Sequence, residues 1–182
     1  ILRNEINTEL SSFNLVIKPN VLIPGNTYTF MLTGIDSAGR GYSQINLNIN
    51  TPPRGGDITI TPTQGISMNT SFNLYLYSWT DDINDLPILY NFGTINNGFS
   101  YINTPNNKNR INTYLSESIN DTTLVIGYIQ DVHKGKVNVT SAIKVNPYQK
   151  PLRVIKNEIF TSINEYINTG DLISCVNTIN TF

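Results

Sequence analysis

The sequence is short of the residues that most catalytic and metal sites need. It contains one cysteine, one histidine and one tryptophan in 182 residues. A single cysteine excludes an intrachain disulfide, and a single histidine excludes a zinc site built from several histidines. Cys175 lies in an apolar helical pattern and is interpreted as a buried hydrophobic residue, while His133 lies in a polar turn. We therefore predict no enzyme activity, no cofactor and no metal site.

Charge and long apolar runs are scarce too. Only 14% of the residues are charged, and the formal net charge is -1. Without a basic surface the chain cannot hold phosphate backbones, so we predict no nucleic-acid partner. No apolar run approaches the ~20 residues of a membrane-spanning helix, so this segment is not expected to insert into a membrane. The chain begins with Ile and shows no signal peptide, which favours a fragment or a processed piece of a longer protein.

Asparagine and isoleucine are abundant instead, with 27 and 25 copies. AT-rich coding accounts for both excesses, because both residues have AT-rich codons. An asparagine-rich disordered tract would lack the regular alternation of Ile, Val and Leu that this chain shows. The excess is therefore informative about the genome rather than about function.

Alternation of apolar and polar residues is the main pattern through the first 147 residues. Segments 27–36 and 42–50 alternate on either side of a glycine-containing turn, which predicts a β-hairpin with Ile45 and Leu47 facing a core. The later alternating segments are separated by Gly and Pro turns and cover residues 57–61, 71–79, 86–95, 123–131 and 136–147. Residues 62–65 are interpreted as a turn and residues 96–112 as mostly loop, although residues 99–102, "FSYI", could form a short strand. Strands at this spacing predict a mostly β fold made of β-sandwich domains.

The apolar period changes to a helical one after Pro151. Ile155, Ile159 and Ile163 recur at helical spacing, Gly170 suits a helix C-terminus, and Asp171 can cap a second helix. We predict three parts: residues 1–50 as the later part of one sandwich, residues 51–147 as a complete second sandwich, and residues 148–182 as a helical segment. The stretch "TPPRGG" is the predicted joint between the sandwiches.

The stretch after this joint carries an ordered set of residues. Paired prolines and paired glycines are followed by a Pro and Gly turn, by F-x-L, by W-x-D and by a Pro–Tyr segment. The matching residues are Pro52, Pro53, Gly55, Gly56, Pro62, Gly65, Phe72, Leu74, Trp79, Asp81, Pro87, Leu89 and Tyr90. The set resembles the REJ (receptor for egg jelly) module of polycystin-like receptors, over roughly residues 20 to 147. Ile58 and Leu76 stand where that family usually has two cysteines.

The resemblance implies tandem fibronectin type III-like sandwiches in a non-enzymatic extracellular segment of a large polycystin-like membrane receptor. Such a segment acts as a spacer and an interaction array, and the helical part would begin a GAIN-type domain. Its location would be the extracellular side of the cell surface, including the ciliary membrane. Its partners would be other domains of the same chain and an unidentified protein or glycan ligand. The alternative is a structural or adhesive component of a cell-surface or ciliary filament or coat.

Individual residues allow narrower expectations. The joint replacement of two family cysteines by Ile58 and Leu76 predicts that these side chains are in contact across the core, where they fill the volume of a lost disulfide. Trp79 is expected in the core. The tyrosines at positions 75, 77, 90, 101, 128 and 148 are expected to pack their rings, with a contact face as the alternative. Three N-glycosylation sequons are ranked in the order Asn120, Asn69 and Asn138.

Four aspartates are the remaining candidates for chemistry. Asp81, Asp82 and Asp85 follow the tryptophan closely, and Asp131 lies in a later turn. Calcium binds where several carboxylates converge, but aspartate at strand ends is also ordinary turn chemistry, which we favour. Asp81 and Asp131 are also the only fair pair for a hydrolase, a function class that we do not expect.

Overall fold

The structure is a computed structural model that describes residues 3–149 and 151–180. The chain divides into two compact units, Ile1–Thr51 and Pro52–Phe182, and each is described by itself. Ten strands and two α-helices form within the described residues, so the predicted mostly β fold with helices at the C-terminal end is confirmed.

The first unit is built around one β-hairpin. Strands β1 (Thr27–Asp36) and β2 (Gly39–Asn48) pair in antiparallel register, and a 3₁₀ turn, η1 (Arg3–Glu5), lies earlier in the chain. The tight turn is held by Asp36, whose Oδ1 accepts the N–H groups of Ala38 at 2.8 Å and Gly39 at 3.0 Å. This local hydrogen bonding is the ordinary reason for an aspartate at a turn.

The hairpin's apolar face is exposed, which corrects the prediction that Ile45 and Leu47 face a core. Their exposed fractions are 66% and 43%. The alternation correctly predicted the strands, because successive side chains of a strand point to opposite faces and every second residue therefore shares a face. Burial requires a second layer, and residues 3–51 form only this one two-stranded sheet.

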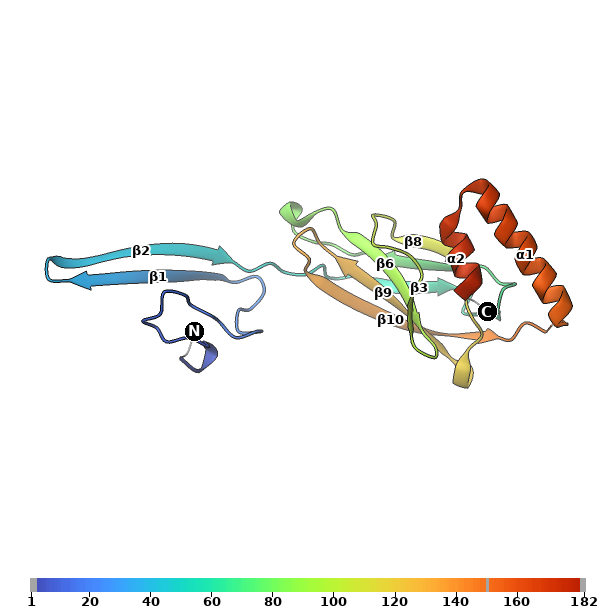
Figure 1. Ribbon diagram of the computed structural model, residues 1–182, viewed down its shortest axis with the longest axis horizontal. Helices are drawn as coiled ribbons and strands as arrows, with labels where there is room; N and C mark the ends of the chain where they lie inside the picture. The colour runs from blue at the N-terminus through green and yellow to red at the C-terminus, as the bar shows by residue number, and fades with distance from the viewer. Residues whose placement is uncertain (1–2, 150, 181–182) are drawn as a thin grey trace. The chain divides into compact units, whose positions relative to one another are not determined.

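The second unit contains two facing β-sheets (Figure 1). One sheet has the order β3-β5-β8, made of β3 (Asp57–Thr61), β5 (Phe72–Tyr77) and β8 (Arg110–Thr113). The other has the order β4-β10-β9-β6-β7, made of β4 (Gln64–Ile66), β6 (Leu89–Ile95), β7 (Phe99–Tyr101), β9 (Thr123–Gln130) and β10 (Lys136–Asn146). Strands β4 and β8 occupy segments that we interpreted as turn and loop, so those two interpretations were wrong.

The core lies between these sheets. Phe72, Leu74 and Leu76 of β5 are fully buried. They pack in one cluster with apolar residues of the facing sheet, which are Phe92, Val125, Ile129, Ile143 and Val145. Ile58 is the register partner of Leu76, and both are buried as predicted. They lie side by side on neighbouring strands of one sheet, which corrects the prediction that they meet across the core. The two positions at which the sequence resemblance implies a pair of family cysteines are thus adjacent and apolar here.

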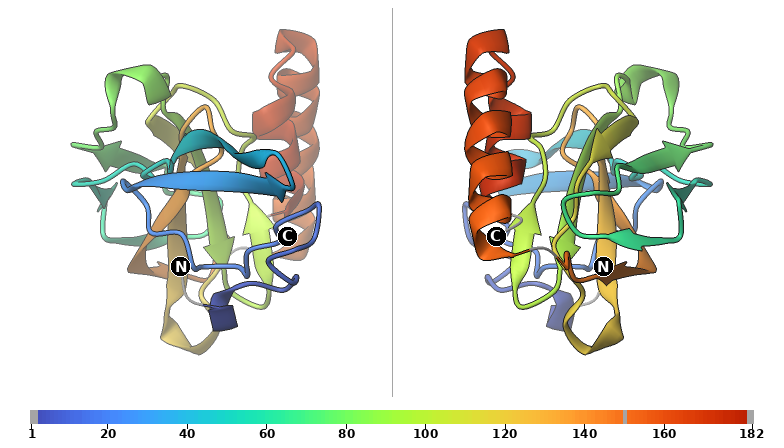
Figure 2. Two further views of the ribbon diagram at one scale, coloured as in Figure 1. Left: turned by 90° about the vertical axis from the view of Figure 1, so that its left-hand side faces the viewer. Right: turned by 90° about the vertical axis from the view of Figure 1, so that its right-hand side faces the viewer.

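Two α-helices complete the second unit. They lie side by side in Figure 1 and in both views of Figure 2. Helix α1 (Leu152–Thr169) ends at Gly170, whose φ of 74° gives the predicted left-handed C-cap. Helix α2 (Leu172–Asn180) begins at Asp171, whose carboxylate accepts the N–H of Ser174 at 3.0 Å. The hydrogen bonds from Ser174 lower the pKa of Asp171, as expected for an N-cap carboxylate.

The helices are linked to the sandwich by polar contacts. The Tyr148 hydroxyl donates to Glu158 Oε2 of α1 at 2.6 Å. Several apolar side chains of the helices remain exposed, among them Phe160 at 66% and Leu172 at 67%. Cys175 is half-buried in α2. None of the helices in the described part of the chain combines the length and the apolar character needed to cross a bilayer.

Candidate functional site

The proline- and glycine-rich stretch and the tryptophan segment lie against each other at the start of the second unit. The backbones of Arg54 and Thr80 exchange two hydrogen bonds of 2.9 and 3.0 Å. Gly56 lies under the indole of Trp79, because a Cβ built at Gly56 would be 2.4 Å from Trp79 Cγ. Gly55 has a φ of 82°, in the region that favours glycine. These glycines therefore serve the packing of Trp79, which is half-buried and packs against the core cluster rather than lying within it, so the prediction of a core tryptophan holds only in part.

The other residues of the REJ-like set also have structural places. Pro53 and Phe72 are fully buried, and Tyr90 packs against the core. Burial, followed by the neighbouring Tyr75, raises the pKa of Tyr90, so its hydroxyl stays neutral. Pro62 and Pro87 each follow a cis peptide bond.

The structure describes the side chains of two of the three glycosylation candidates, Asn69 and Asn138. Asn69 is exposed in the connection between β4 and β5. Asn138 is exposed on β10, between the half-buried Val137 and Val139, so it occupies the outward face that a glycan requires. The side chain of Asn120 lies outside the described residues. Glycan attachment at all three stays a prediction.

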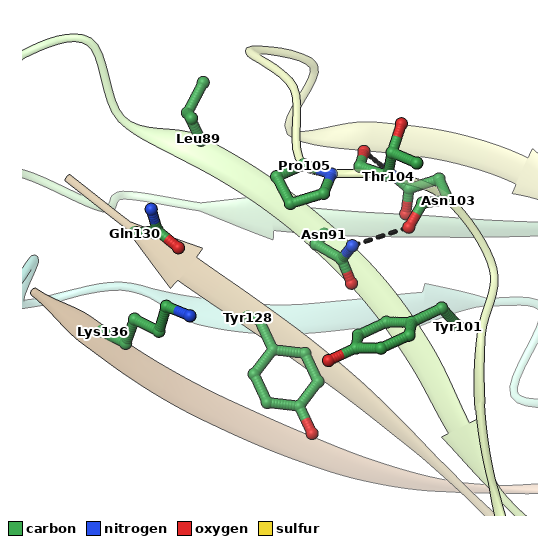
Figure 3. Close-up of a pocket in the computed structure, with 9 residues that line it drawn as sticks. All are labelled: Leu89, Asn91, Tyr101, Asn103, Thr104, Pro105, Tyr128, Gln130 and Lys136. Carbon is green, nitrogen blue, oxygen red and sulfur yellow. Dashed lines mark hydrogen bonds between the residues drawn. The ribbon is translucent and has the colours of Figure 1, made fainter. Parts of the chain in front are cut away.

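A concave site opens on the outer face of the five-stranded sheet (Figure 3). Its volume is about 410 Å³, within the range of pockets that hold small ligands or single side chains. Strands β6, β9 and β10, with the end of β7 and the loop after it, supply its lining: Leu89, Asn91, Tyr101, Asn103, Thr104, Pro105, Tyr128, Gln130 and Lys136. We call this group the β6–β9 pocket.

An aromatic cluster forms one wall of the β6–β9 pocket. The rings of Tyr101 and Tyr128 have centroids 6.0 Å apart, and Phe99 lies edge-on to both, at 4.5 and 5.9 Å. Gly93 permits this arrangement, because a Cβ there would lie 2.8 Å from the Phe99 ring. Tyr101 is 60% exposed, so its ring is accessible to a ligand.

A buried amide network forms the other wall. Asn91 Nδ2 donates to the backbone oxygen of Asn103 at 2.6 Å, and Asn103 Oδ1 accepts the N–H of Phe92 at 2.7 Å. These bonds fasten the loop after β7 to β6. Asn91 Oδ1 is buried and has no hydrogen-bond partner among the described residues. Figure 3 shows this oxygen turned away from Asn103, on the side of the two tyrosine rings.

The lining groups suit binding by contact. Aromatic faces take up apolar surface, while the amides of Asn91 and Gln130 and the amine of Lys136 offer hydrogen bonds at the edges. A buried acceptor without a partner costs free energy unless a donor reaches it, so Asn91 Oδ1 is the natural anchor for a donor group. The sequence suggested Tyr101 and Tyr128 only as two of six tyrosines, and it gave no indication of Asn91 or Asn103.

The second unit thus combines two facing β-sheets, a pair of helices and a pocket on the outer face of the larger sheet. A family model described as the REJ domain matches residues 1–181. The chain therefore belongs to the REJ domain family, whose domain is a non-catalytic, receptor-type module found in polycystin-like receptors. The match extends over both units and the helices, beyond the residues that carried the sequence resemblance.

Proposed function

We propose that the chain is a non-enzymatic extracellular segment of a large polycystin-like membrane receptor, where it acts as a spacer and an interaction array. The observation that carries this proposal is the REJ domain match over residues 1–181. The REJ-like residues support it because those with described places pack the start and the core of the second unit, as Gly56 does against Trp79. The cell surface, including the ciliary membrane, is the proposed location.

We assign the second unit a fibronectin type III-like or immunoglobulin-like sandwich. The support is its strand order, β3-β5-β8 facing β4-β10-β9-β6-β7. Consecutive strands change sheet at every step except within the hairpins β6–β7 and β9–β10. The core is continuous between the sheets, and β9 and β10 pair over eight residues. Paired backbone ladders and a packed core resist extension, which suits a spacer.

The β6–β9 pocket is the proposed contact surface of the array. Its ligand is a protein or a glycan that places an apolar face on Tyr101 and Tyr128 and a hydrogen-bond donor on Asn91 Oδ1. The loop that forms its rim is fixed by buried hydrogen bonds, so little conformational entropy is lost on binding.

The cellular placement is tested with an antibody raised against this segment. We expect staining of intact, unpermeabilised cells and, on immunoblots, a band far larger than the 20.4 kDa of this chain that shifts after endoglycosidase treatment. The band should partition with detergent-extracted membranes. Extraction without detergent would instead favour the filament or coat alternative. A band near 20.4 kDa with no shift, in cells that stain only after permeabilisation, would contradict the receptor assignment.

The contact surface is tested on an array of defined oligosaccharides with the purified chain. We expect Tyr101→Ala and Tyr128→Ala each to weaken binding by about tenfold or more, since stacked aromatic contacts contribute on the order of 1–2 kcal/mol. Tyr75→Ala is the matched control, because Tyr75 lies on β5 and contacts Tyr77 and Arg110 instead. No binding by the parent chain would contradict a glycan ligand, and equal losses in all three variants would contradict the β6–β9 pocket as its site.

A further inference from the structure

Three carboxylates converge in the connection between β5 and β6. Asp81, Asp82 and Asp85 each place one oxygen within 4.8 Å of the others. The 3₁₀ turn η2 (Ile83–Asp85) brings Asp85 back toward the two preceding residues, and its N–H bonds to the oxygen of Asp82 at 2.9 Å. Asp85 is itself buried. Carboxylates pushed together in this way repel each other unless a positive charge lies among them.

The burial of Asp81 is a second and independent observation. Its side chain has an exposed fraction of 0%. Its Oδ1 accepts the N–H of Asp82 at 2.9 Å, whereas Oδ2 is buried and has no hydrogen-bond partner among the described residues. Buried carboxylates are normally paired, hydrogen-bonded or bound to a metal. Oδ2 of Asp81 is therefore an oxygen that lacks the ligand its burial requires.

The neighbouring cations pair with other carboxylate oxygens of the cluster rather than with Asp81 Oδ2. Arg54 Nη1 lies 3.8 Å from Asp81 Oδ1, while Arg54 Nη2 donates to Oδ1 of the exposed Asp82 at 2.9 Å. The Arg54 side chain is 56% exposed. His133 approaches Asp85 at 3.4 Å and is 59% exposed. Desolvation first, and then the carboxylates of Asp131, Asp85 and Asp82, raise the pKa of Asp81. Arg54 and the imidazole of His133 thus face four carboxylates.

We propose that Asp81, Asp82 and Asp85 bind a divalent cation, and that this ion is calcium. Calcium takes six to eight oxygen ligands at 2.3–2.6 Å in flexible geometry, so it can use three carboxylates whose oxygens lie within 4.8 Å of one another. Magnesium demands near-ideal octahedral geometry and gives up its water reluctantly, which an irregular loop of this kind does not favour. Three carboxylates supply only part of the coordination, so backbone oxygens and water complete it. This inference does not depend on the proposed function.

The bound ion would fasten two loops at one end of the sandwich. The oxygen of Asp85 accepts the N–H of Val132, which lies in the turn between β9 and β10. Asp131 in the same turn is fully buried and accepts the N–H of Gly135 at 2.8 Å. Neutralising the three carboxylates would therefore order the β5–β6 connection and the β9–β10 turn together.

The test uses the purified chain after removal of metals with EDTA. The chain's only tryptophan, Trp79, is two residues from Asp81, so terbium bound at the site should luminesce on tryptophan excitation. We expect calcium to displace terbium, with a dissociation constant on the order of 10⁻⁴–10⁻³ M, and to raise the melting temperature by a few degrees. Asp82→Asn and Asp85→Asn should each weaken calcium binding by about tenfold or more, because each removes a ligand charge.

The matched control is Asp121→Asn, because Asp121 is an exposed carboxylate that pairs with Lys144 outside the cluster. It should leave calcium affinity unchanged. Asp82 is itself exposed, so Asp82→Asn keeps the test valid even if variants of the buried aspartates fail to fold. Absence of calcium binding up to about 10 mM would overturn the proposal, as would equal affinity for magnesium or equal loss in Asp121→Asn.

Discussion

Replacing Gly56 with alanine is expected to destabilise the second unit by about 3 kcal/mol. The new Cβ would lie 2.4 Å from Trp79 Cγ and Cδ2 and 2.5 Å from Cδ1, far inside van der Waals contact. The indole cannot easily move away, because it packs against the core and its segment is tied to Arg54 by two backbone hydrogen bonds. Overpacking of this kind displaces both backbone and ring.

The measurement is denaturant unfolding followed by fluorescence, which reports on the second unit because Trp79 is the only tryptophan. Gly34→Ala is the control, since a Cβ at Gly34 meets nothing within 4 Å and Gly34 belongs to the first unit. An unfolding midpoint of Gly56→Ala equal to that of the parent would show that Gly56 is not required for packing Trp79.

The sequence predicted the long strands of the sandwich well because burial and alternation agree in them. On β5 the buried residues Phe72, Leu74 and Leu76 alternate with half-buried ones, so a single pattern reveals both the strand and its inward face. The capped helices were equally visible, since Gly170 and Asp171 act through local backbone chemistry. Local signals of this kind need no knowledge of distant residues.

Two short strands, β4 and β8, were missed because their pairing is supplied by distant segments. Strand β4 has three residues and pairs in parallel with β10, from Gln64 to Lys144. Strand β8 has four residues and lies within an asparagine-rich stretch that favours loops by composition. Neither has a local pattern long enough to compete with turn chemistry.

The two candidate sites were predictable to different degrees. The closeness of Asp81, Asp82 and Asp85 follows from their numbering, but the burial of Asp81 does not, because it depends on how the loop folds against the sandwich. The β6–β9 pocket combines Asn91, Tyr101 and Tyr128 from separate strands. The high frequency of asparagine hid the buried Asn91, since the sequence offers no way to separate it from exposed copies.

Ile58 and Leu76 are adjacent, so replacing both with cysteine is expected to form a disulfide. This is the second change for which we expect a large effect. In Ile58→Cys/Leu76→Cys the cysteines would be direct register partners on antiparallel strands. Directly opposed residues have Cα atoms about 4.5–5.5 Å apart, which is compatible with disulfide geometry. The bond would close a loop of about 18 residues, so the oxidised variant should be about 3 kcal/mol more stable than its reduced form.

The reduced variant should in turn be less stable than the parent, because two buried aliphatic side chains are shortened in a fully packed region. The comparison is made in a Cys175→Ala background by denaturant unfolding with and without reductant, with free-thiol titration to confirm the bond. Ile58→Cys/Leu74→Cys is the control, since these positions are diagonal, about 7–8 Å apart, and should remain reduced. A thiol count of two in the oxidised Ile58→Cys/Leu76→Cys variant would contradict the register. Bond formation with the expected gain would show that Ile58 and Leu76 occupy positions whose geometry accommodates the covalent link that the sequence resemblance implies.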